Sequence, residues 1–153
     1  DIKDGKVVCK SRIGLVSDCV TFSKDDNLID LIEKNRKHQD EFVVIVDECQ
    51  FCSTLQIEQL QVVSRKYQVL CYGLLTNFKT ELFEGSKRLV EIADSLAEIK
   101  SVCKCGKKAN VNARFINGKL TLTGDEILIG GNEYYESLCF SCYEKIKRNL
   151  VTD

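Results

Sequence analysis

Four cysteines in two tight pairs are the clearest chemical feature of the sequence. The pairs are Cys103-Lys104-Cys105 and Cys139-Phe140-Ser141-Cys142, and the segment between them is long enough to form a hairpin. Four thiolates are the number of ligands that a closed, tetrahedral structural zinc site requires. The pattern therefore predicts one structural zinc ion, and free thiols or disulfides are the alternatives.

The other five cysteines occur singly or loosely within apolar or motif segments. An odd total of nine cysteines fits a disulfide framework poorly. We therefore expect reduced thiols in the core, in addition to the metal site. These five residues are Cys9, Cys19, Cys49, Cys52 and Cys71.

A second candidate site follows the apolar run FVVIV at residues 42–46, which ends in Asp47-Glu48. A carboxylate at the end of a buried parallel strand lies where the sheet opens, and there it can hold magnesium. A second carboxylate beside it can accept the proton of an attacking hydroxyl. On its own the pattern fits an ordinary solvated strand end equally well.

Several aromatic residues and a glycine pair flank these motifs. Taken by spacing alone, core packing is the favoured interpretation. The alternative is a flat slot for a ring-shaped substrate, which the backbone at Gly130-Gly131 can approach closely. The aromatic residues are Phe51, Phe78, Tyr134 and Tyr135.

The elements that must position these residues alternate between helix and strand over the first hundred residues or so. Residues 28–37 have helical spacing, residues 42–46 predict a strand buried on both faces, and residues 69–74 predict a second buried strand. Between the strands, Ser53 and Gln56 resemble a capping box that opens a helix. This helix should turn Leu55, Leu60 and Val63 toward the core.

Another helix should start at Ser86, with Leu89, Ile92, Ala93 and Leu96 on one face. Strands that alternate with helices are typical of a parallel α/β sheet, so residues 1–100 are predicted to form an α/β core.

Residues 101–153 have a different character. Asn117-Gly118 lies between two alternating segments and predicts a tight hairpin. Residues 126–129 predict a further β segment, and residues 143–150 a closing helix. We expect a small β-rich domain with the cysteine pairs at its base.

Composition limits the function classes. The chain has 153 residues, 44% of them hydrophobic, and a formal net charge of −1, so no basic excess marks a nucleic-acid surface. No apolar run approaches the ~20 residues that span a bilayer, and the first residues lack the apolar core of a signal peptide. We expect a cytoplasmic protein without nucleic-acid or membrane partners. The single histidine, His38, lies in a polar stretch and is given no role.

In order along the chain, DECQF, CYGLLTNFKTELFEGS, C-x-C-G and IGGNEYYESLCFSC resemble the thymidine kinase family of the zinc-containing cytosolic type, particularly its bacterial branch. The resemblance covers nearly the whole chain. It implies a P-loop-type nucleoside kinase core with a zinc-binding lid. It also implies a homotetramer that uses magnesium and ATP to phosphorylate the 5′-hydroxyl of thymidine.

The resemblance also implies roles for single residues. Glu48 matches the catalytic base, and Asp47 matches the magnesium carboxylate. With Cys49, Gln50, Asp1 and Lys3, these residues would surround magnesium and ATP, although Lys3 stands where the family has arginine. For thymidine, the resemblance implies contacts with Phe78, with Tyr135 and with the backbone of Glu126, Ile127, Leu128, Ile129 and Gly130.

Other positions depart from the family pattern. Leu75 stands where arginine is usual, and Asn77 where aspartate is common. No segment matches the phosphate-binding loop G-x-x-x-x-G-K-[ST]. We therefore expect a truncated or processed chain that is nearly inactive by itself. The alternative function is a non-catalytic, zinc-bearing scaffold or interaction protein derived from the kinase.

Overall fold

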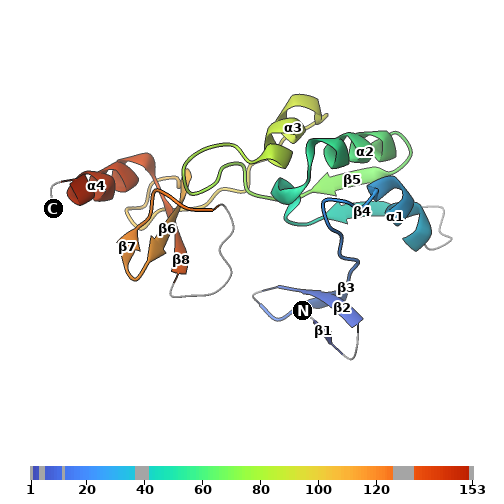
Figure 1. Cartoon of the computed structure of the whole chain (residues 1–153), viewed down its shortest axis with the longest axis horizontal. Helices are drawn as coiled ribbons and strands as arrows, with labels where there is room; N and C mark the ends of the chain where they lie inside the picture. The colour runs from blue at the N-terminus through green and yellow to red at the C-terminus, as the bar shows by residue number, and fades with distance from the viewer. Residues whose placement is uncertain (1, 4–5, 12, 37–41, 126–132, 152–153) are drawn as a thin grey trace.

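The computed structural model describes residues 2–3, 6–11, 13–36, 42–125 and 133–151 (Figure 1). The described part is a mixed α/β structure with three small sheets. A parallel strand pair with its helices lies between an antiparallel N-terminal sheet and a C-terminal sheet in sequence order. None of the helices in these ranges has the length and apolar content that crossing a membrane requires.

The parallel pair consists of β4 (Val43–Val46) and β5 (Gln68–Cys71), paired from Val43↔Gln68 to Val46↔Cys71. The 3₁₀ helix η1 (Cys49–Phe51) and α2 (Thr54–Ser64) connect the two strands, which confirms the predicted strand–helix–strand unit. Strand β5 ends at Cys71, earlier than predicted, because its partner β4 ends at Val46.

One hydrophobic cluster holds this unit together. It contains Val44 and Val46 of β4, and α1 (Leu28–Asn35) contributes Leu28. Helix α2 contributes Ile57, Leu60 and Val63 to the same cluster, and α3 (Glu84–Ile92) packs Leu89 and Ile92 against it. The capping box at the start of α2 is confirmed: Ser53 Oγ accepts from the Gln56 N–H, and Gln56 Oε1 accepts from the Ser53 N–H.

Four burial predictions are wrong. The strand predicted at residues 69–74 is not buried, since no residue of β5 is buried and Leu70 and Leu74 are exposed. Strand β4 is buried on one face only, since Val43 and Ile45 are exposed, the latter by 65%. Leu55 is exposed because it lies on the side of α2 opposite the buried residues. Leu96 is exposed because α3 ends at Ile92, before the helix could carry residue 96 onto its core face.

The N-terminal sheet was not predicted. It orders β1 (Ile2–Lys3), β2 (Lys6–Lys10) and β3 (Val16–Asp18) as antiparallel neighbours. The predicted parallel arrangement therefore does not extend to these strands. The physical reason is the length of the connections, because a parallel crossover needs about a dozen residues or more, and Lys3 pairs directly with Lys6.

The C-terminal part forms a second sheet in the order β7-β6-β8, covered by α4 (Phe140–Val151). Strands β6 (Val111–Ile116) and β7 (Lys119–Leu120) are joined through Asn117 and Gly118, whose φ angles of 50° and 79° fit a tight two-residue turn. The predicted hairpin is confirmed. Strand β8 (Glu133–Leu138) pairs with β6 along its whole length.

A separate cluster of buried residues, including Cys103, Ala113, Phe115 and Cys139, supports this sheet. The division of the chain near residue 100 stays a prediction. The β segment predicted at residues 126–129 lies outside the described residues, as does His38.

Candidate active site and metal centre

The turn after β4 carries the two predicted carboxylates. Asp47 and Glu48 are both exposed, and Asp47 Oδ1 accepts from the Glu48 N–H at 3.0 Å. Glu48 has φ 54° and ψ 36°, a left-handed conformation that is uncommon for a residue other than glycine. This conformation ends the strand and starts η1, so it places both carboxylates at the carboxyl end of the parallel pair.

The side chain of Gln50 holds Glu48 in place. Gln50 is only 2% exposed; its Nε2 donates to Glu48 Oε2 at 2.5 Å, and its Oε1 accepts from the Leu74 N–H at 3.0 Å. A Cβ at Gly73 would collide with the side chains of Gln50 and Cys49, so the glycine makes room for this contact. The carboxylate of Glu48 is thereby tied to the segment after β5.

Three further cysteines lie next to this turn. A hydrogen bond with Cys71, together with burial, raises the pKa of Cys49, and burial raises the pKa of Cys52 to about 11. Both groups are therefore neutral thiols at pH 7.

All nine cysteines are free, but Cys9 and Cys19 are exposed, so the expectation that they lie in the core is wrong. Cys9 lies on β2 and Cys19 directly follows β3, and neither strand contributes to the two buried clusters.

Helix α3 packs closely against the same turn. Glu84 Oε1 accepts from the backbone N–H of Thr54 at 2.8 Å and from its hydroxyl at 3.1 Å, and these bonds lower the pKa of Glu84. Gly85 lies against the backbone of η1, and a Cβ there would be 2.5 Å from the carbonyl oxygen of Cys49. The position of the carboxylate turn thus depends on the absence of a side chain at residue 85.

We expect Gly85→Ala to lower the free energy of unfolding by about 1–3 kcal/mol, because the new methyl group meets backbone atoms that cannot rotate away. This cost exceeds the helix-propensity gain of at most ~1 kcal/mol from replacing glycine. Urea unfolding measures the effect. Lys87→Ala, at an exposed position of the same helix, should change stability by no more than about 0.5 kcal/mol. Equal stability of the two variants would contradict the close packing.

The N-terminal sheet also reaches the turn. Cys9 on β2 places its Sγ 3.8 Å from Asp47 Oδ2. This contact was not predicted, because residues 38 positions apart leave no local pattern in the sequence. Among the predicted phosphate-side residues, Lys3 lies in β1, the neighbour of β2, and Asp1 lies outside the described residues.

The predicted metal ligands come together. The Sγ atoms of Cys103, Cys105, Cys139 and Cys142 all lie within 4.8 Å of one another, and Cys105 and Cys139 are 3.6 Å apart. Four sulfurs around zinc, with Zn–S bonds of about 2.3 Å, lie roughly 3.8 Å apart. The donor set and its size therefore fit a structural zinc site.

Two local structures present these thiols. Cys103 begins a tight turn in which the Gly106 N–H donates to the Cys103 carbonyl, whereas Cys139 immediately precedes α4 and Cys142 lies in its first turn. N–H donation from Cys105 and Cys139 lowers the pKa of Cys103 to about 6. Hydrogen bonds with the sulfurs of Cys105, Cys139 and Cys103 raise the pKa of Cys142 to about 12. Such crowding of thiols favours a cation that would neutralise them as thiolates.

The predicted nucleoside residues have different surroundings. Phe78 is 2% exposed, and Arg114 Cζ lies 3.6 Å from the centre of its ring. Tyr135 is exposed on β8, directly opposite Arg114 on β6. Arg114 thus contacts Phe78 and is the cross-strand neighbour of Tyr135. The remaining predicted contacts, Glu126, Ile127, Leu128, Ile129 and Gly130, lie outside the described residues.

The other two aromatic residues pack against neighbouring rings. Tyr134 stacks on Phe115 with ring centres 5.0 Å apart, and Phe51 meets Phe83 edge-on at 5.6 Å. These contacts support the packing interpretation for Phe51 and Tyr134. The slot interpretation then rests on Phe78 and Tyr135.

The two residues near Phe78 that depart from the family pattern, Asn77 and Leu75, differ in burial. Asn77 is buried, and its Oδ1 accepts from the N–H groups of Lys79 and Glu81 at 2.9 and 3.1 Å. An aspartate could accept the same two bonds. Leu75 is exposed.

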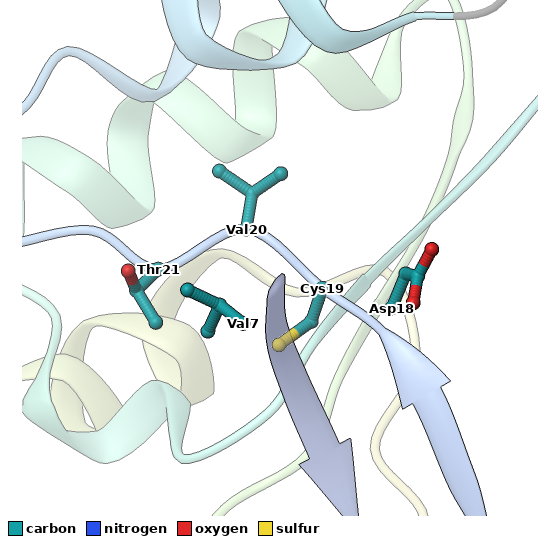
Figure 2. A pocket seen from close by; sticks show the side chains of 5 residues that line it. All are labelled: Val7, Asp18, Cys19, Val20 and Thr21. Atoms are coloured by element: carbon teal, nitrogen blue, oxygen red, sulfur yellow. The ribbon is translucent and has the colours of Figure 1, made fainter. Parts of the chain in front are cut away.

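A hollow of about 380 Å³ lies beside the N-terminal sheet (Figure 2). Val7 of β2 lines it together with Asp18 of β3 and the three residues that follow, Cys19, Val20 and Thr21. None of these residues was predicted to have a role. Its lining offers one carboxylate among small side chains, which identifies no ligand.

Comparisons with known proteins agree with one another. A family model described as thymidine kinase matches residues 1–143. The chain is 46% identical over 142 residues to a thymidine kinase of Shewanella oneidensis, covering 91% of this chain and 74% of that protein. Over 144 residues it is 44% identical to a thymidine kinase of Aliivibrio fischeri and 45% identical to one of Haemophilus influenzae, covering 92% of this chain and 74% of each relative. The expectation of an inactive chain has no support in these matches.

Proposed function

Because the chain belongs to the thymidine kinase family, and is by that membership an ATP-dependent thymidine kinase, we propose that the turn after β4 performs the transfer. The observation that carries this assignment is the left-handed Glu48 at the end of a parallel strand, with its carboxylate fixed by Gln50. Uncommon backbone conformations cost energy, and they concentrate at functional sites. The same family membership disfavours the scaffold alternative.

In this proposal, Glu48 accepts the proton of the 5′-hydroxyl of thymidine as that oxygen attacks the γ-phosphorus of ATP. Its carboxylate is exposed and therefore accessible to the hydroxyl. Phosphoryl transfer depends mainly on positioning and on charge stabilisation. The bond from Gln50 supplies the positioning, because it limits the rotation of the carboxylate.

Asp47 would hold magnesium, which when bound neutralises charge on the phosphates. Its Oδ1 accepts from the Glu48 N–H, while Oδ2 faces Cys9 on β2, the middle strand of the N-terminal sheet. Asp1 and Lys3 would lie on the phosphate side. The side chains of Cys49 and Gln50 are buried beneath the turn, so we assign them to its support rather than to direct contact with ATP.

The four-cysteine cluster would hold one structural zinc ion. The ligands come from a turn before β6 and from the start of α4, so the metal would join these two segments at the end of the sheet where Val111 pairs with Leu138. Protein sulfurs fill all four positions of a tetrahedral site, which leaves none for a substrate.

We propose that the thymine ring is surrounded by Phe78, Tyr135 and the backbone of residues 126–130.

We also propose, on the family resemblance alone, a cytoplasmic homotetramer. Light scattering coupled to gel filtration tests the tetramer, and a monomer at micromolar concentration would contradict it.

Transfer of the labelled γ-phosphate of ATP to thymidine tests the function itself. We expect thymidine monophosphate as the product, with little product from cytidine under the same conditions. Omitting magnesium should abolish the reaction, because the phosphate charges would then be uncompensated. Equal rates with cytidine and thymidine would contradict the proposed nucleoside site.

A further inference from the structure

Arg114 is a buried cation that donates hydrogen bonds to backbone carbonyls. It is 1% exposed, its Nη1 donates to the Asp125 carbonyl at 2.7 Å, and its Nη2 donates to the Thr123 carbonyl at 2.8 Å. Within the described ranges its Nε has no hydrogen-bond partner. Burying a charge costs free energy, and an apolar residue often fills the same volume at lower cost. Packing alone therefore explains this arginine poorly.

The guanidinium joins two segments that are distant in sequence. Its Cζ lies 3.6 Å from the ring centre of Phe78, which follows the parallel pair, whereas Arg114 itself belongs to β6 of the C-terminal sheet. Gly124 has φ 105°, and a Cβ there would lie 2.8 Å from Nη2. The turn at residues 123–125 is thus fitted closely around the arginine.

Arg114 also lies beside the second proposed nucleoside residue. Arg114 and Tyr135 are direct cross-strand partners of β6 and β8, and partners in an antiparallel pair project from the same face of the sheet. The guanidinium covers one face of the Phe78 ring at close range. That face is therefore not available for stacking by a thymine ring.

We infer that Arg114 is a positioning residue for the nucleoside. It holds the Phe78 ring and the turn at residues 123–125 in one arrangement, and it prevents thymidine from stacking on the ring face that the guanidinium covers. This inference rests on the proposed function. It assigns Arg114 no contact with thymidine and no part in moving the phosphoryl group.

The test compares Arg114→Gln with Arg88→Gln in the zinc-loaded protein. Arg88 is a matched control because it is half-buried and its Nε also lacks a hydrogen-bond partner among the described residues. Its ion pair with Glu58 joins α2 to α3, and its pair with Glu91 lies within α3, so neither pair involves Phe78. For Arg114→Gln we expect the KM for thymidine to rise about 10- to 100-fold, while the KM for ATP changes no more than about twofold. For Arg88→Gln both constants should stay within about twofold.

Amide hydrogen exchange provides a second measurement that does not depend on enzyme activity. In Arg114→Gln, amide hydrogen exchange should become faster both at residues 77–81 and at residues 121–125, since the two segments lose their common anchor. Arg88→Gln should leave both segments unchanged. Arg114→Lys keeps the charge but lacks the planar fork that reaches both carbonyls, so it should give a smaller rise in the thymidine KM.

A folded Arg114→Gln protein with an unchanged thymidine KM would overturn the inference. If that variant does not fold, an unchanged KM in Arg114→Lys overturns it equally. The activity of the unsubstituted protein tests the proposed function separately from the role of Arg114. If it fails to phosphorylate thymidine, the proposed function is wrong, whereas normal activity in all variants refutes only the role of Arg114.

Discussion

Replacing Glu48 with glutamine should lower the turnover of thymidine about 10²- to 10⁴-fold, because the amide cannot accept the proton of the 5′-hydroxyl. The substitution keeps the size of the side chain and leaves an oxygen that can accept from Gln50 Nε2. Thymidine binding should therefore change little. Steady-state phosphorylation gives the turnover, and calorimetry gives the dissociation constant.

Glu91→Gln is the control for this experiment. Glu91 is an exposed carboxylate on α3 that pairs with Arg88, and nothing places it at the turn after β4. Its variant should keep the turnover within about twofold. Near-normal turnover in Glu48→Gln would remove this residue from the mechanism, whatever its backbone conformation.

Replacing Cys139 with serine should release the zinc ion and destabilise the C-terminal sheet. Structural zinc binding in small domains contributes roughly 10–16 kcal/mol to the folded state, so losing one ligand affects much of the local stability. Cys103 and Cys139 also belong to the buried cluster with Ala113 and Phe115, which means that the ligands and the core of this sheet are the same residues. Metal analysis under reducing conditions should find one zinc ion per chain before the substitution and far less after it.

Cys19→Ser is the matched control, because Cys19 is exposed and lies outside the cluster. It should keep the zinc content and the thermal unfolding midpoint. A protein that contains no zinc when freshly reduced, or one in which Cys139→Ser unfolds at the same temperature as the starting protein, would contradict the zinc site.

Local signals in the sequence determined much of the framework. The β-branched run before Asp47 predicted a strand, Ser53 and Gln56 predicted the start of α2, and Asn117-Gly118 predicted the hairpin. Each of these signals acts within a few residues, through strand preference, a capping bond or a left-handed turn. The spacing of the two cysteine pairs likewise predicted that the four thiols would lie together, as they do.

Sequence patterns predicted the burial of side chains less well than they predicted helices, strands and turns. Alternation in β6 places Arg114 on the face opposite Ala113 and Phe115, where a charged residue is expected to meet solvent. Instead, the face is covered by Phe78 and by the turn at residues 123–125. Conversely, Ile45 looked like a core residue and is exposed. Burial depends on which segments pack together, and segments distant in sequence carry no local record of that.

The geometry of the candidate active site became visible only in the folded structure. The sequence placed Asp47 and Glu48 at the end of a strand, but it gave no sign of the left-handed Glu48 or of the bonds through which Gln50 ties it to Leu74. It also missed the approach of Cys9 to Asp47. Residue types and short spacings determine which chemistry is possible. Contacts between residues twenty or more positions apart fix how the groups are held, because only the folded chain brings those residues within bonding distance.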